Sequence, residues 1–149
     1  MTKCVNCFIP YQDKAQVEQT VRGLKESMLV NRIYLLSTDH LAEPVEGCEI
    51  VHIESLKCTP AIKKIAEKSD SQFTLIYTKE STLMLGLFAL ERMVKISEDT
   101  SAGMVYADHF QIIEGVKKQS PVITYQMGSL RDDFNFGSVL FYNSKALKE

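Results

Sequence analysis

The chain lacks several features that define common protein classes. Its 149 residues contain no apolar run approaching the ~20 residues that a membrane-spanning helix needs. Charge of one sign is not in excess, because 17 Lys and Arg stand against 19 Asp and Glu, for a net charge of −2. That balance argues against a nucleic-acid-binding protein that relies on phosphate neutralisation. The N-terminus lacks the basic-then-apolar layout of a signal peptide, so we expect a cytoplasmic location.

Common nucleotide-binding fingerprints are also missing. The chain contains neither GxGxxG nor a Walker A motif, so the usual dinucleotide and ATP folds are not expected. Cys4-x-x-Cys7 resembles a redox or zinc pair, but no second CxxC or HxxxH completes a zinc set. Both cysteines fall in a strand pattern, where positions three apart face opposite sides of a sheet. Buried free thiols are therefore favoured over metal or redox chemistry.

What the chain does contain is a regular alternation of apolar strands and amphipathic helices. A length of 149 residues fits one domain, spanning residues 1–149. The alternation predicts an α/β fold with a mostly parallel sheet, followed by a short antiparallel section. Strands are expected near residues 3–9, 32–36, 49–53, 73–77, 103–106 and 138–142, with a hairpin around 110–118. Because a helix begins at 144 just before the end, we expect this to be the N-terminal part of a longer protein.

Two helix predictions rest on particular residues. Asp13 is a good N-cap, with Gln16 three positions later, and predicts a helix running to about residue 28. A second helix is expected over residues 82–96. Its buried face would carry four residues at helical spacing, namely Leu83, Leu87, Leu90 and Val94.

Polar or aromatic residues follow three of the expected strands. Pro10-Tyr11 follows the first, Thr38-Asp39 the second, and Thr78-Lys79-Glu80 the fourth. In open α/β sheets, ligands bind at the carboxyl ends of parallel strands. The pattern therefore predicts a nucleotide-type pocket along one edge of the sheet.

The order of these segments resembles that of inverting family-two glycosyltransferases. The segment from Phe8 to Asp13 is similar to the family's IPxYN opening, and the strand ending in Asp39 to its VDDGSxD segment. The segment from Thr59 to Ile62 lies where the family carries GxxxARN, and the segment from Phe73 to Glu80 where it has YILFLDxDD. Residues 103–108 and 128–137 resemble the later part of a divergent branch.

The resemblance implies a GT-A-like three-layer αβα sandwich that binds a nucleotide-diphosphate sugar. Pro10 and Tyr11 would flank the nucleobase, and Asp39 or Thr38 would reach the base or ribose. Glu80 would be the acidic member of the metal-binding DxD motif, with Thr78 and Lys79 beside it. Mg²⁺ or Mn²⁺ would then bridge the phosphates.

Two departures from the family pattern affect the chemistry. Thr78-Lys79-Glu80 supplies one carboxylate where DxD supplies two, and Lys79 could neutralise the diphosphate itself. The family's general base comes from a later ED segment, which would lie beyond Glu149. Sugar transfer, as in polysaccharide biosynthesis, would therefore require residues outside this chain.

Other candidates have simpler alternatives. On the acceptor side, Asp108 could join His109 as a metal pair, and Arg131-Asp132-Asp133 could bind the acceptor or form a solvated turn. Tyr11 could equally be packing, Asp39 a turn residue, and Glu80 a charge near a helix N-terminus.

Two functions therefore remain open: a glycosyltransferase acting on a glycan or other hydroxyl acceptor, and a non-catalytic relative that binds a nucleotide or a partner. Self-association is also expected, because apolar residues 140–142 lie near the chain end.

Overall fold

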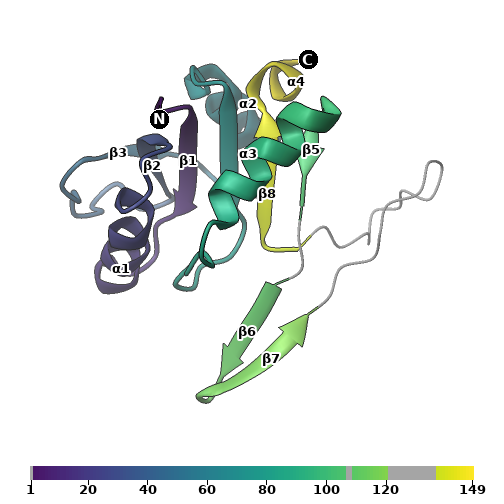
Figure 1. Cartoon of the computed structure of the whole chain (residues 1–149). Helices are drawn as coiled ribbons and strands as arrows, with labels where there is room; N and C mark the ends of the chain where they lie inside the picture. The colour runs from purple at the N-terminus through teal and green to yellow at the C-terminus, as the bar shows by residue number, and fades with distance from the viewer. Residues whose placement is uncertain (1, 107–108, 121–136) are drawn as a thin grey trace.

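The computed structural model describes residues 2–106, 109–120 and 137–149. Six strands form one sheet in the order β3-β2-β1-β4-β8-β5 (Figure 1). The strands of this sheet are β1 (Val5–Pro10), β2 (Val30–Ser37), β3 (Cys48–His52), β4 (Phe73–Tyr77), β5 (Met104–Val105) and β8 (Val139–Asn143). The helices are α1 (Lys14–Lys25), α2 (Thr59–Lys68), α3 (Ala89–Thr100) and α4 (Ser144–Lys148).

The sheet is mostly parallel, as the sequence predicts. β1 pairs in parallel with β2 and β4, and β2 pairs in parallel with β3. β8 is antiparallel to both β4 and β5, between which it is inserted. The sequence predicts a short antiparallel section after the parallel units, and one strand of that section, β8, lies within the main sheet.

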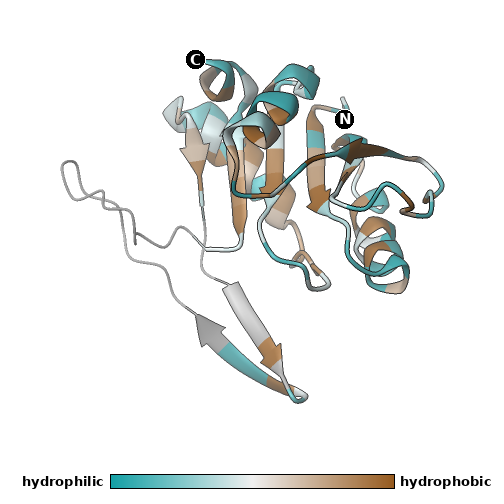
Figure 2. Cartoon of the chain, turned by 180° about the vertical axis from the view of Figure 1, so that it is seen from behind, coloured by the Kyte–Doolittle hydropathy of each residue, from teal (hydrophilic) through white to brown (hydrophobic). Residues whose placement is uncertain are grey.

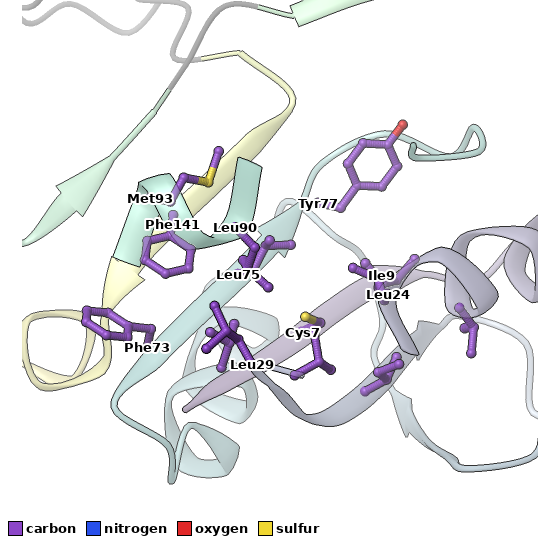
Figure 3. Packing of buried hydrophobic residues seen from close by; sticks show 14 of the residues in the cluster. Cys7, Ile9, Leu24, Leu29, Phe73, Leu75, Tyr77, Leu90, Met93 and Phe141 are labelled. Atoms are coloured by element: carbon purple, nitrogen blue, oxygen red, sulfur yellow. The ribbon is translucent and has the colours of Figure 1, made fainter. Parts of the chain in front are cut away.

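The central strand β1 is buried along its whole length, because helices cover both faces of the sheet. Its side chains alternate between two apolar clusters, with Cys7 and Ile9 in one and Phe8 in the other. α1 and α3 contribute to the first cluster (Figure 3), and α2 and α4 to the second. Hydrophobic residues concentrate in the strands between these layers (Figure 2). The result is the three-layer αβα arrangement that the resemblance implies.

The predicted helix over residues 82–96 is wrong at its start. α3 spans Ala89–Thr100, and Phe88 before it has a left-handed backbone with φ 57°. Leu87 is 85% exposed, although its spacing predicts the buried face, whereas Leu90 and Val94 are buried. The left-handed backbone of Phe88 separates residues 82–87 from α3, and the Leu83 N–H of this preceding loop donates to Thr20 Oγ1 of α1 at 3.0 Å.

The cysteines are free thiols, as expected. Cys7 is fully buried in β1, and this burial raises the pKa of its thiol to about 12. Cys4 precedes the strand and is only half-buried. Within the described ranges, no group of three or more His, Cys, Asp or Glu side chains could hold a metal ion.

The chain's later elements are a hairpin and the inserted strand. β6 (His109–Ile113) and β7 (Val116–Ser120) form the predicted hairpin, which extends away from the six-stranded sheet (Figure 1). Glu114 and Gly115 at its turn both have positive φ, as a type I′ turn requires. Phe141 of β8 is fully buried, so the apolar surface expected there for self-association is covered at that residue.

Candidate functional site

The topology brings the three predicted strand ends to one edge. β1 lies between β2 and β4, with Pro10 opposite Leu36 of β2 and Phe8 opposite Ile76 of β4. The loops that leave β1, β2 and β4 therefore start side by side at the carboxyl edge of the sheet. We call the residues that begin them the carboxyl-edge site: Pro10, Tyr11, Thr38, Asp39, Thr78, Lys79 and Glu80.

Tyr11 is held by both its backbone and its ring. Its N–H donates to the Leu36 carbonyl at 2.8 Å, which extends the β1–β2 pairing by one residue. The ring is half-buried and packs against the first apolar cluster. One side of the Tyr11 ring therefore has a packing role, and the exposed side can contact a ligand.

Asp39 is positioned by a tight turn that Ser37 organises. Ser37, which is 1% exposed, accepts the Asp39 N–H at 3.0 Å and donates to the Asp39 carbonyl at 2.9 Å. One carboxylate oxygen of Asp39 accepts the Leu41 N–H at 2.8 Å. Asp39 is therefore a turn residue whose side chain remains exposed, as is that of the neighbouring Thr38.

The end of β4 is fixed through Thr78. Both its N–H and its Oγ1 donate to the Ser138 carbonyl, at 2.9 and 3.0 Å. Lys79 and Glu80 follow with exposed side chains. Because α3 begins at Ala89, the interpretation of Glu80 as a charge at a helix N-terminus is wrong.

Charges of both signs surround this edge. An ion pair joins Lys14 of α1 to Glu43 in the loop after β2, with Nζ and Oε2 2.9 Å apart. The hydrogen bond that Lys14 donates to Glu43 raises the pKa of Lys14. The carboxyl-edge site itself contains two exposed acidic side chains, Asp39 and Glu80, and one exposed cation, Lys79.

The residues predicted for the acceptor side, Asp108, Arg131, Asp132 and Asp133, lie outside the described residues. The structure thus brings together the donor-side candidates at one edge, while the acceptor-side candidates stay predictions.

Sequence reasoning missed a polar network at the opposite, amino edge of the sheet. Asn6 in β1 is fully buried, and its Nδ2 donates to Asp70 Oδ1 at 2.6 Å. Its Oδ1 accepts from Ser71 Oγ at 2.9 Å. The Asn6 hydrogen bond, with Arg32 nearby, lowers the pKa of Asp70. An amide in an otherwise apolar strand was the one sequence signal for this network.

Two surface pockets also lie at the amino edge. One, of about 440 Å³, is lined by residues including Asp70, Ser71, Asn143 and Lys145. The other, of about 470 Å³, includes Lys25, Met28 and Asn31. Neither includes a residue of the carboxyl-edge site.

Comparisons with known proteins support the fold. No protein-family profile matches the chain, and no curated protein matches its sequence. A solved structure that it resembles is 2-C-methyl-D-erythritol 4-phosphate cytidylyltransferase from Thermus thermophilus. The alignment has a TM-score of 0.50 and 14% identity, and covers 97% of this chain and 72% of the other.

This likeness concerns the fold alone. The mostly parallel six-stranded sheet is of the nucleotide-diphospho-sugar transferase type, in agreement with the fold predicted from the sequence. No helix in the described parts of the chain is both long enough and apolar enough to cross a bilayer.

Proposed function

We propose that this chain is the nucleotide-sugar-binding part of an inverting, family-two-like glycosyltransferase. The donor would be a nucleotide-diphosphate sugar, and the acceptor a glycan or other hydroxyl compound. The observation that carries the proposal is the adjacency of β1, β2 and β4, whose carboxyl ends present Tyr11, Asp39 and Lys79-Glu80 at one edge. Ligands of open α/β sheets bind at such an edge.

Each residue would contact a different part of the donor. The exposed part of the Tyr11 ring would lie against the nucleobase. Asp39 has one carboxylate oxygen bonded to the Leu41 N–H, and its other oxygen would accept a hydroxyl of the ribose or an N–H of the base. Because Ser37 fixes the turn, little ordering of Asp39 would be needed on binding.

The diphosphate would lie near Lys79 and Glu80. The lysine is a point charge that neutralises phosphate directly. Glu80 supplies one carboxylate, which suffices for Mg²⁺ or Mn²⁺ when phosphate oxygens complete the coordination. When bound, such an ion would offset the charge on the departing nucleoside diphosphate. Catalysis would still need a general base, which is not among these residues.

Calorimetric titration of the protein with UDP, GDP, CDP and their sugar conjugates tests this proposal. Cytidine nucleotides belong in the series because the structural neighbour is a cytidylyltransferase. Binding should fall in Lys79→Ala, and any manganese-dependent part should disappear in Glu80→Gln. Lys145→Ala and Glu67→Gln, exposed residues away from this edge, are the matched controls and should bind normally.

A second candidate is a non-catalytic relative that binds a nucleotide or a protein partner. It is favoured by one observation: Thr78-Lys79-Glu80 offers one carboxylate and a positive charge where the family has two acids. Metal-independent nucleotide binding without sugar discrimination would support this candidate. A folded protein that binds no nucleotide would contradict the proposed donor site.

A further inference from the structure

The connection from β4 to α3 is long for its place in the fold. It covers residues 78–88, between Tyr77 at the end of β4 and Ala89 at the start of α3 (Figure 1). Connections from a strand to a helix in α/β units commonly take about 2–6 residues. The second part of the connection, residues 82–88, is the segment for which the sequence predicts the beginning of the helix.

This segment is under strain and exposes apolar side chains. Phe88 has a left-handed backbone with φ 57°, which bulky residues seldom adopt because their Cβ crowds the carbonyl oxygen. The side chains of Met84, Leu87 and Phe88 are 69%, 85% and 64% exposed. The observed loop is therefore disfavoured both by its backbone conformation and by the apolar surface that it leaves in water.

The same residues are suited to a helix. Leu90 and Val94 give α3 its buried face, and Leu83 and Leu87 continue that face at helical spacing. Residues 83–85 read Leu-Met-Leu, and both residue types are strong helix formers. An extension of α3 toward its N-terminus thus agrees with the local sequence.

The chain also offers a better start for this helix than the one observed. The present N-cap of α3 is Phe88, whose side chain makes no capping hydrogen bond, whereas Thr82 belongs to a type that caps helices well. A helix capped by Thr82 leaves residues 78–81 as the link from β4, which is of ordinary length. As its first residue, Leu83 would have an N–H without an intrahelical partner, so the 3.0 Å bond to Thr20 suits both states.

One residue of the segment opposes the helix. Gly86 would lie in its interior, where glycine is less stable than alanine because it loses more backbone freedom. This cost is of the same order as the strain of a single left-handed residue such as Phe88. The loop and the helix therefore differ by opposing contributions of similar size, as a segment with two accessible states requires.

We propose that residues 82–88 are a two-state segment, which converts between the observed loop and about two further turns of α3. The conversion releases Phe88 from its left-handed backbone. It also adds Leu83 and Leu87 to the buried face of the helix.

The carboxyl-edge site is coupled to this segment through the chain. Lys79 and Glu80 lie within residues 78–81, which become a short link when the helix forms, so their positions differ between the two states. A ligand that contacts them binds the two states with different affinity and shifts the equilibrium. This coupling rests on the proposed function, with a nucleotide diphosphate as the ligand, whereas the conversion itself does not.

Two substitutions shift the equilibrium in opposite directions without any ligand. A Cβ at Gly86 would meet no other group within 4 Å, and its backbone is not left-handed, so the loop accepts alanine while the helix gains stability. Gly86→Ala should raise the ratio of helix to loop about fivefold. Phe88→Gly should lower this ratio about tenfold or more, because glycine adopts the left-handed backbone freely and weakens the helix.

The ¹³Cα chemical shifts of residues 82–84 measure this ratio, because a helical backbone displaces them in a known direction and neither substitution adjoins them. They should be most helical in Gly86→Ala and least helical in Phe88→Gly, with the unaltered protein between. Gly23→Ala, the same substitution inside α1, is the matched control and should leave them unchanged. Equal shifts in Gly86→Ala and Phe88→Gly would overturn the two-state segment, provided that the remaining spectrum shows both proteins to be folded.

Addition of UDP with Mg²⁺ to the unaltered protein tests the coupling. The shifts of residues 82–84 should move toward helical values on saturation, and Gly86→Ala should bind UDP more tightly than Phe88→Gly does. Binding that leaves these shifts unchanged would overturn the coupling. Absence of UDP binding would refute the proposed donor site, while the shifts measured without ligand still decide whether the segment has two states.

Discussion

Replacing Phe141 tests the insertion of β8 between β4 and β5. Phe141 is fully buried, and its ring stacks on Phe73 of β4 with centroids 5.2 Å apart. Truncating a buried phenylalanine to alanine removes its transfer free energy and leaves a cavity, at a cost of about 3–5 kcal/mol. For a domain of this size, a loss near 4 kcal/mol lowers the Tm by about 8–16 °C.

Urea unfolding followed by circular dichroism measures this loss in Phe141→Ala. Ile112→Ala, at an exposed position of the hairpin, is the control and should change stability by less than about 0.5 kcal/mol. If the alanine variant does not fold, a double-mutant cycle with Phe73→Leu and Phe141→Leu replaces it. Coupling of about 0.5–1.5 kcal/mol is expected for an aromatic pair. A Phe141→Ala cost as small as that of the control, or zero coupling, would refute the placement of β8.

Three further predictions concern the polar network, a helix cap and a thiol. Asn6→Ala should cost about 2–3 kcal/mol near neutral pH, because the fully buried Asn6 loses its bond to a carboxylate. That bond lowers the pKa of Asp70 below its ordinary value of 3.8. The bond therefore contributes fully to the free energy of unfolding above pH 3.8, and this contribution is lost as the pH falls through the pKa that Asp70 has in the folded protein. Urea unfolding from pH 7 to pH 2 should therefore show a difference between the two proteins that shrinks in acid; a constant difference would contradict the assignment. Asp13→Ala should lower the free energy of unfolding by about 1 kcal/mol, because it removes the N-cap of α1. In the same assay Asp13→Asn, which also caps helices well, should retain most of this stability. Cys7, with its pKa raised to about 12 by burial, should resist alkylation in the folded protein at pH 8 and react on unfolding, as mass spectrometry would show; rapid labelling of the native protein would contradict its burial.

The sequence predicts a strand or helix correctly where the local pattern of apolar residues matches the burial that the structure shows. β1 and β4 are continuous apolar runs buried on both faces, and both lie where the pattern predicts. Asp13 caps α1 as expected, its side chain accepting the Ala15 N–H at 2.9 Å. Because parallel strands end at the same edge of a sheet, the placement of the donor-side residues at one edge could also be anticipated. That β1 and β4 are direct neighbours, although they are not consecutive strands, could not.

Prediction failed where a distant contact decides local structure. Leu83 and Leu87 have helical spacing, but they lie in a loop whose Leu83 N–H bonds Thr20 of α1, and the helix begins only after the left-handed Phe88. The hydrogen bonds of Asn6 join it to residues 64 and 65 positions away, so no local pattern reveals them. The stacking of the His40 ring on that of His52 likewise depends on the β2–β3 register, which the sequence does not specify.

The most direct test of the central claim is where a nucleotide binds. Two-dimensional NMR of ¹⁵N-labelled protein, titrated with UDP and GDP with and without Mg²⁺, locates the contact residue by residue. The account predicts shift changes at Tyr11, Asp39 and Lys79, on the carboxyl ends of β1, β2 and β4. Changes confined to the amino-edge pocket around Ser71 and Asn143, or none at all in a folded protein, would contradict it.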